Sequence, residues 1–192
     1  MSDIIEINGK RFIFIHIPKT GGLSISKTFK LKEGHQSIRT FKNKYYSFAF
    51  VRNPWDRLIS SFIYLNRGGM GGKDIIDRDK YLLKYKGDFN YFVKYGLINN
   101  MKYFFNQQHL RPQYKFISDW KGKIIVNKIF RFEKISDDFN QMCDLMQTER
   151  MNLPHLNKSD HNNYRNYYNS ELINIVEKVY SKDIKIFNYN YL

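Results

Sequence analysis

Two short segments of the chain combine side chains and backbone groups that are suited to binding anions. The first is His16-Ile-Pro-Lys-Thr-Gly-Gly-Leu-Ser24, which continues an apolar run. Its two glycines allow the backbone to approach a ligand closely, Lys19 adds a mobile positive charge, and Thr20 and Ser24 add hydroxyl donors. Backbone N–H groups converge where a strand passes through such a turn into a helix, and the helix dipole favours negative charge there. We therefore interpret Lys19 to Ser24 as an anion site, the alternative being an ordinary strand–turn–helix connection.

The second segment is Phe48-Ala-Phe-Val-Arg-Asn-Pro-Trp-Asp-Arg-Leu-Ile-Ser-Ser61. Arg52 stands at the carboxyl end of an expected strand, where open α/β sheets bind ligands. Ser60 lies about two turns into the helix that follows. An arginine fork and a hydroxyl together suit a phosphate monoester. Two alternatives stay open at this point: Ser60 as a small helix residue, and Arg52 as the partner of Asp56.

Positioning these residues requires strands that alternate with helices. Strands, recognised by runs of β-branched and aromatic residues, are expected at 11–17, 46–51 and 123–132. Helices, recognised by capping residues and apolar periodicity, are expected at 23–30, from Pro54 with Asn53 as N-cap, from a Ser136 cap through Met146, and after a Ser170 cap. We expect a flexible glycine-rich loop at 67–73 and weakly patterned helices at 74–106. This alternation predicts an α/β fold with a mostly parallel sheet.

The composition is that of one globular domain. The 192 residues fall in the usual range for one domain, so we expect a single domain over 1–192. Hydrophobic residues at 42% and aromatic residues at 17% exclude a disordered basic tail, which has too little apolar surface to bury. Because Cys143 is the only cysteine, internal disulfides and cysteine-rich zinc modules are excluded.

The charge balance predicts anionic ligands. The chain has 32 Lys and Arg against 18 Asp and Glu, a formal charge of +14, which suits nucleic acid as well as small or polymeric anions. Apolar runs are too short for a transmembrane helix, and Met1-Ser2-Asp3-Ile4-Ile5-Glu6 carries acids where a signal peptide carries basic residues. We therefore expect a cytoplasmic protein without signal peptide or anchor.

The two segments together resemble the paired signatures of the sulfotransferases. His-Ile-Pro-Lys-Thr-Gly-Gly-x-Ser begins at His16, and Phe-Val-Arg-Asn-Pro-x-x-Arg-Leu-x-Ser begins at Phe50. They are most similar to the carbohydrate branch that contains heparan sulfate 2-O-sulfotransferase. Arg131-Phe-Glu133 and the stretch from Leu153 resemble less specific parts of the family. The resemblance implies a P-loop-like three-layer fold and the donor 3′-phosphoadenosine 5′-phosphosulfate (PAPS), without a metal.

The resemblance also implies roles for the site residues. The turn would hold the 5′-phosphosulfate through Lys19, Thr20, Gly21, Gly22, Leu23 and Ser24; relatives often carry Thr at the position of Leu23, so one hydroxyl contact is lost here. Arg52 and Ser60 would hold the 3′-phosphate. Lys158 and Ser159 would close over the nucleotide, the alternative being a solvated loop. In the transfer step, Lys19 would neutralise the bridging oxygen of the leaving phosphate.

Transfer to a hydroxyl also requires a base, and histidine has a pKa suited to neutral pH. His35, in Gly34-His-Gln-Ser-Ile38, lies between the two phosphate motifs, in the interval where relatives that use a histidine base carry it. We therefore predict His35 as the catalytic base, with Glu33 as the carboxylate alternative.

The other histidines receive different assignments. His16 ends an apolar strand and is interpreted as a hydrogen-bonded structural residue, whereas His109 could face the acceptor together with Gln113. His155 and His161 lack the carboxylate or thiolate companions that a metal site requires.

The expected partners are a nucleotide sulfate donor and a hydroxyl acceptor, with no nucleic acid and no membrane span. Residues 67–112 are expected to shape the acceptor site, and their Lys and Tyr content would suit an anionic saccharide. One alternative is a basic nucleic-acid-binding protein that uses its charge and aromatic residues; its charges, however, are scattered. The other is a phosphotransferase with the same loop, disfavoured because an acidic magnesium-ligand pair does not accompany it.

Overall fold

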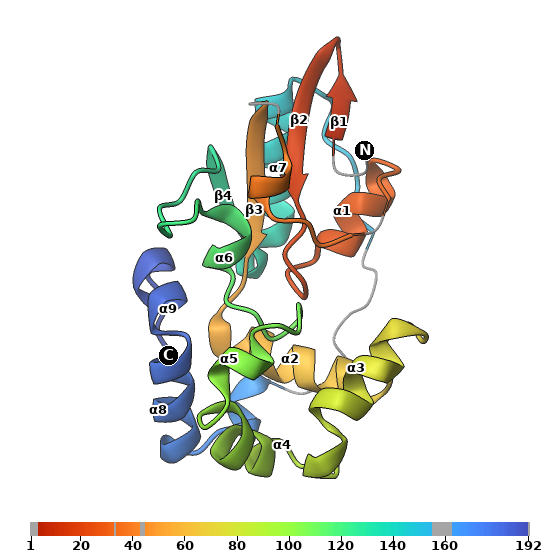
Figure 1. Ribbon diagram of the computed structural model, residues 1–192. Helices are drawn as coiled ribbons and strands as arrows, with labels where there is room; N and C mark the ends of the chain where they lie inside the picture. The colour runs from red at the N-terminus through yellow and green to blue at the C-terminus, as the bar shows by residue number, and fades with distance from the viewer. Residues whose placement is uncertain (1–3, 33, 43–44, 155–162, 192) are drawn as a thin grey trace. The chain divides into compact units, whose positions relative to one another are not determined.

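The computed structural model describes residues 4–32, 34–42, 45–154 and 163–191 (Figure 1). The chain divides into two compact units. The first consists of Met1–Arg52 and Gln113–Lys158, and the second of Asn53–Pro112 and Ser159–Leu192. Each unit has its own apolar core. The expectation of a single domain over 1–192 concerns cooperative folding and stays a prediction.

The first unit is built on a sheet whose described strands follow the order β1-β2-β3-β4, with bounds Ile4–Ile7, Lys10–Ile15, Tyr46–Val51 and Lys128–Arg131. β2 pairs with β3 and β3 with β4 in parallel, which confirms the expected mostly parallel sheet. β1 is an antiparallel edge strand that the sequence analysis did not identify. Its hairpin turn is Asn8-Gly9, with φ of 51° and 73°, and this dipeptide is a strong hairpin signal because both residues tolerate positive φ.

Aromatic side chains form the core of the first unit. Phe14, Phe48, Phe50 and Phe130 lie in one apolar cluster with the buried faces of two helices, α1 (Gly22–Thr28) and α7 (Ile135–Met146). Figure 1 shows α7 behind the strands. The other described helices of this unit are short: η1 (Ile38–Thr40), α6 (Tyr114–Ile117) and η4 (Phe132–Lys134). The two helices thus pack on the sheet through this cluster, and the close packing fixes the positions of the strand ends.

The second unit is helical in the residues described. Its helices are α2 (Pro54–Asn66), α3 (Lys73–Tyr81), η2 (Leu83–Tyr85), α4 (Phe89–Tyr91), η3 (Phe92–Leu97), α5 (Met101–Phe104), η5 (Tyr164–Tyr167), α8 (Ser170–Val179) and α9 (Ser181–Phe187). The prediction for α2 is confirmed in detail, because the Asn53 side chain accepts hydrogen bonds from the N–H groups of Trp55 and Asp56. The expected helices at 74–106 are also present. None of the helices in the described residues is both long and apolar enough to cross a membrane.

Three sequence predictions of element boundaries are wrong. The strand expected at 123–132 is limited to Lys128–Arg131. Ser136 lies inside α7, which begins at Ile135. Ser170 is the first residue of α8, and the N-cap is Asn169, whose side chain accepts a hydrogen bond from the N–H of Leu172 at 2.9 Å. In the Asn-Ser pair both side chains can cap, and the Asn carboxamide reaches the third helical N–H from one residue earlier.

Removal of the Asn169 cap should lower the free energy of unfolding. Asn169→Ala should cost about 1 kcal/mol, because the N–H of Leu172 loses its acceptor. The matched substitution Ser170→Ala, one residue later on the exposed helix start, should change stability by at most about 0.5 kcal/mol. Urea denaturation of both variants measures the difference, and a larger loss for Ser170→Ala would contradict the observed cap.

Candidate functional site

The turn between β2 and α1 has a strained, well-braced backbone. Lys19 and Gly21 have φ of 67° and 80°, so two residues of the turn are left-handed. The hydroxyl of Thr20, which is fully buried, donates to the carbonyl of Ile17 at 2.8 Å. The N–H of Ser24 donates back to the carbonyl of Gly21 at 3.2 Å. Turns that alternate such conformations direct successive N–H groups to one side and form a concavity for anions. The expected hydroxyl donor Thr20 therefore braces the turn here.

Both glycines are required by close packing as well as by backbone conformation. A Cβ on Gly21 would overlap the side chain of Ile135 and crowd the ring of Phe132. A Cβ on Gly22 would overlap the imidazole of His16. The turn is therefore pressed against the segment that follows β4 on one side and against a histidine ring on the other. This packing fixes where the N–H groups of the turn lie.

Arg52 binds the turn directly. Its guanidinium is buried at the end of β3, where Nη1 donates to the carbonyl of Lys19 at 3.1 Å. The same guanidinium lies over the ring of Phe132, 4.2 Å from the centroid. The ends of β2, β3 and β4 thus meet around one arginine, as expected for the carboxyl edge of a parallel sheet. Lys19, the other cation of the site, is half-buried.

The backbone of Arg52 is held by a side chain from a distant part of the sequence. Gln113 is fully buried, and its Oε1 accepts from the N–H of Arg52 at 2.9 Å while its Nε2 donates to the Arg52 carbonyl at 2.8 Å. At the point where β3 ends, the carboxamide therefore makes the two backbone hydrogen bonds that a neighbouring strand would otherwise make. Gln113 was expected to face the acceptor with His109; the structure instead uses it to position Arg52.

His35 lies beside the turn through its contact with His16. The two imidazole rings are 4.3 Å apart between centroids, with an interplanar angle of 68°. His16 is buried and stacks on Phe14, in agreement with a structural role. Nδ1 of His35 lies 3.1 Å from the carbonyl oxygen of His16. Because a carbonyl only accepts, Nδ1 carries the proton, and the basic lone pair of the neutral ring is on Nε2.

The structure does not give the positions of the remaining expected site residues relative to this cluster. Ser60 is buried on α2 and belongs to the second unit, so its role toward a phosphate stays a prediction. Lys158, Ser159 and the alternative base Glu33 lie outside the described residues. Phe132 received no functional assignment from the sequence, although its place directly after a strand, at the same sheet edge as Arg52, was a usable signal.

His109 belongs to a separate polar cluster in the second unit. Its Nε2 lies 3.7 Å from Oδ1 of Asp74, and both side chains are largely buried. The other carboxylate oxygen accepts from the hydroxyl of Tyr64 at 2.6 Å and from the N–H of Met70 at 3.0 Å. The His109 side chain holds the pKa of the Asp74 carboxyl well below its usual range, and the bonds from Met70 and Tyr64 act in the same direction against burial. This carboxylate ties the glycine-rich loop, including Gly69, to α2 and α3.

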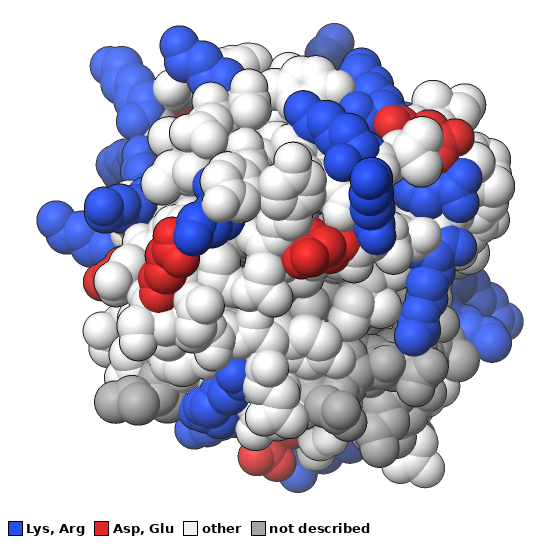
Figure 2. Space-filling model, turned by 90° about the horizontal axis from the view of Figure 1, so that it is seen from below, with Lys and Arg blue, Asp and Glu red and all other residues white. Residues whose placement is uncertain are grey.

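Within the part of the chain that the structure describes, His, Cys, Asp and Glu side chains do not gather in groups of three or more that could hold a metal. Cys143 is buried, and burial raises the pKa of its thiol. On the face shown in Figure 2, Lys and Arg side chains are dispersed and separated by uncharged and acidic residues. That face does not offer the continuous basic stripe that a polynucleotide backbone would follow.

The turn and Arg52 lie at the carboxyl edge of an α/β sheet, and comparison with known families defines the class of the protein. The chain belongs to the sulfotransferase family, whose family model matches residues 4–190. Members of this family transfer a sulfuryl group, generally from PAPS, to a hydroxyl acceptor. No curated protein and no solved structure gives a significant match to the chain. The predicted family is therefore confirmed, whereas its carbohydrate branch stays a proposal.

The packing of Gly22 against His16 makes a specific prediction. Gly22→Ala should lower the free energy of unfolding by about 1–3 kcal/mol, because the new methyl group overlaps the imidazole. In a His16→Ala background the same substitution should cost at most about 0.5 kcal/mol, since alanine is compatible with the helix. Urea denaturation of the four proteins gives both differences. An equal loss in the two backgrounds would show that the ring does not exclude a side chain.

The Asp74 carboxylate should make stability depend on pH. Because its pKa is depressed in the folded state, its contribution is complete above the unfolded carboxyl pKa of about 3.9 and is lost as the pH falls toward the folded value. Asp74→Asn should therefore destabilise the protein at neutral pH, and the difference from wild type should shrink below pH about 4. Tyr64→Phe removes one hydrogen bond to the carboxylate and should show a smaller effect. Urea unfolding across the pH range measures this; a difference independent of pH would contradict it.

Proposed function

We propose that this chain transfers a sulfuryl group from PAPS to a hydroxyl of a saccharide acceptor. The observation that carries the proposal is the contact between the Lys19–Ser24 turn and the buried guanidinium of Arg52, in a chain that belongs to the sulfotransferase family. Two adjacent glycines pack closely against their neighbours and have no side chains of their own. A ligand can therefore approach the backbone of the turn directly. This P-loop-like turn and the arginine fork fit a donor that carries phosphate and phosphosulfate groups.

Different groups of the site would bind different parts of such a donor. Backbone N–H groups from Thr20 to Ser24 would bind the 5′-phosphosulfate, and Lys19 would neutralise charge on the bridging oxygen. Arg52 and Ser60 would bind the 3′-phosphate. Because the Lys19 carbonyl and the Phe132 ring hold the guanidinium of Arg52, and Gln113 fixes its backbone, the guanidinium is preorganised and need not be ordered on binding. PAPS supplies the sulfuryl group, and the leaving bisphosphate takes the bonding pair.

His35 is the base in this proposal. The hydrogen bond from its Nδ1 to the His16 carbonyl fixes the tautomer in which Nε2 accepts a proton. The His16 ring, which contacts His35 on one side, packs against Gly22 on the other. One imidazole therefore separates the base from the donor turn, and the half-buried His35 is open enough to meet a hydroxyl.

Donor binding is tested by thermal unfolding with 3′-phosphoadenosine 5′-phosphate. A concentration of about 100 times Kd should stabilise the protein by about 2.7 kcal/mol, a rise in Tm of about 5–10 °C. AMP and ATP at equal concentration should give much smaller shifts. Arg52→Lys keeps the charge but loses the fork, and should reduce the shift strongly without unfolding the protein. His35→Asn retains a donor for the His16 carbonyl and should bind the bisphosphate normally.

An assay of sulfuryl transfer distinguishes the role of the base from the role of the donor-binding groups. With labelled PAPS and a panel of oligosaccharides, His35→Asn should reduce transfer by about 10²–10⁴-fold, as expected for loss of a general base. The absence of any bisphosphate shift in the wild-type protein would overturn the proposed donor. Normal turnover by His35→Asn would overturn the assignment of the base while leaving the donor site intact.

A further inference from the structure

Trp120 is the most exposed large apolar side chain in the described residues, with 87% of its surface accessible. It stands at the tip of a tight turn in the first unit, between the bridged residues Ser118 and Ile124. The turn is well ordered by hydrogen bonds: the N–H of Asp119 donates to the carbonyl of Lys123 at 2.9 Å, and the Asp119 carboxylate accepts from the N–H of Lys123 at 2.9 Å. The indole is thus presented to solvent by a rigid support.

Arg39 holds one face of this indole. Its guanidinium carbon lies 4.5 Å from the ring centroid, within the range of a cation–π contact. Nη1 also donates to the carbonyls of Ser118 and Asp119, at 3.2 and 3.3 Å. The arginine therefore joins η1 to the turn and lies over one face of the indole. A rigid aromatic ring with an open surface binds flat, partly apolar ligands at a low cost in conformational entropy.

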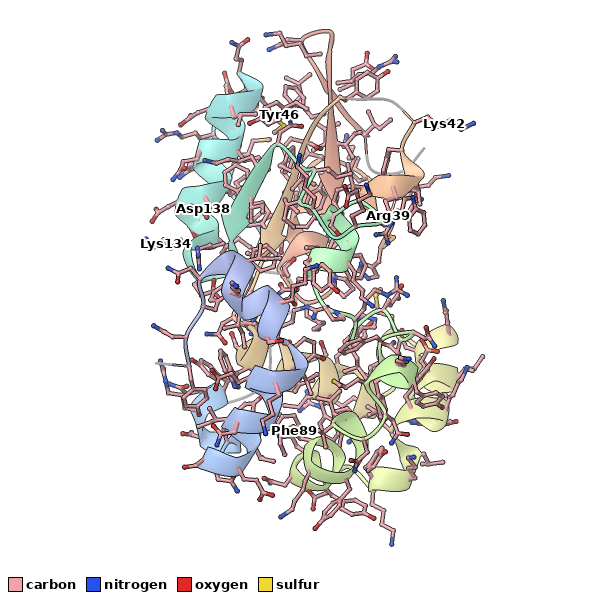
Figure 3. The ribbon with its side chains drawn as sticks, turned by 60° about the vertical axis from the view of Figure 1, so that its left-hand side comes forward. Arg39, Lys42, Tyr46, Phe89, Lys134 and Asp138 are labelled. Carbon is pink, nitrogen blue, oxygen red and sulfur yellow. The ribbon has the colours of Figure 1, made fainter. Side chains whose placement is uncertain are left out.

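The surroundings of the indole are basic. Lys121 and Lys123 are exposed on the same turn, and Lys42 is exposed three residues after Arg39. In Figure 3, Arg39 and Lys42 lie along the same edge of the unit, and Lys42 points outward. The one acidic side chain of the turn, Asp119, is engaged with the backbone of Lys123. A ligand that stacks on Trp120 would therefore meet positive charge, which favours an anionic one.

The same short segment carries the proposed base. His35 is tied to the His16 carbonyl at one end, and the hydroxyl of Ser37 donates to the carbonyl of Phe116 at 3.2 Å. His35 and Arg39 are four positions apart in the sequence, so their Cα atoms lie within about 14 Å. All of these residues belong to the first unit. An oligosaccharide of a few sugar rings that rests on the indole can therefore extend to the base.

We propose that Trp120 and Arg39 form an acceptor subsite for an anionic oligosaccharide, and this inference rests on the proposed function. One sugar ring stacks on the open face of the indole, and its carboxylate or sulfate groups meet Lys42, Lys121 and Lys123. A hydroxyl further along the same chain is thereby held near His35. The sequence analysis expected the acceptor to bind at residues 67–112. The proposed subsite lies outside that range and adds a further contact.

The two tryptophans of the chain provide a direct assay. Trp55 is buried, whereas Trp120 is exposed, so quenching of fluorescence by iodide reports mainly on Trp120. Heparin and hyaluronan hexasaccharides should protect the indole from iodide, and neutral chitohexaose should do so much less. Trp120→Ala should raise the Kd of the anionic hexasaccharides about tenfold in calorimetry. Tyr46→Ala, which removes an exposed aromatic ring at the start of β3, at the other end of that strand from Arg52, is the matched control and should bind normally.

The outcomes distinguish this inference from the proposed function. Loss of saccharide binding in Trp120→Ala, with an unchanged Tm shift by 3′-phosphoadenosine 5′-phosphate, supports the subsite. Equal binding of both anionic hexasaccharides by wild type and Trp120→Ala, or no binding by either, overturns it even if the donor shift is present. Loss of the donor shift in Trp120→Ala would make the indole part of the nucleotide site. Tighter binding of oligo(dT) than of saccharides through Trp120 would replace the proposal by a nucleic-acid surface. A saccharide effect without any donor shift would leave the subsite standing and reject PAPS.

Discussion

The guanidinium of Arg52 is buried in the first unit, where a cation with unsatisfied donors would cost several kcal/mol of stability. A hydrogen bond to the Lys19 carbonyl and a cation–π contact with the ring of Phe132 offset this cost. Both partners lie just after the ends of the two flanking strands. Gln113 then fixes the arginine backbone from a segment more than sixty positions away. The requirement to stabilise one buried cation therefore ties the three parallel strand ends together. The Lys19–Ser24 turn is held by the same bond, since its left-handed Lys19 supplies the carbonyl that accepts it.

The glycine pair Gly21-Gly22 can be explained both by ligand binding and by packing. Read as a ligand motif, Gly21-Gly22 permits close approach of an anion to the backbone. In the structure the same residues also touch Phe132, Ile135 and the His16 ring, all of which a side chain would displace. Packing therefore fixes the turn before any ligand arrives. A preorganised turn loses less entropy on binding, so the structural and the functional demands on these glycines coincide.

Local patterns predicted the elements of this chain better than they predicted its contacts. The strand at 46–51 and the Asn53 cap follow from neighbouring residues alone, because runs of aromatic and β-branched residues and capping side chains act over a few positions. The cap at Asn169 was misplaced by one residue, since two adjacent side chains could serve. The Lys19–Ser24 turn and Arg52 were found as separate motifs, but their hydrogen bond depends on strand order. The clamp by Gln113 depends on tertiary packing in the same way, and a single sequence contains no local signal for it.

The arginines of this chain also explain how a protein with 32 basic and 18 acidic residues satisfies its cations. Arg39 donates to the carbonyls of the Trp120 turn, Arg52 to the Lys19 carbonyl, and Arg57 to the carbonyl of Arg111 at 3.0 Å. A carbonyl satisfies a guanidinium N–H without neutralising its charge, and the planar fork has further donors to offer. These arginines therefore brace the backbone and keep their positive charge. At the proposed donor turn and at the proposed indole subsite, the same hydrogen bond that stabilises the fold would keep positive charge beside the proposed ligand.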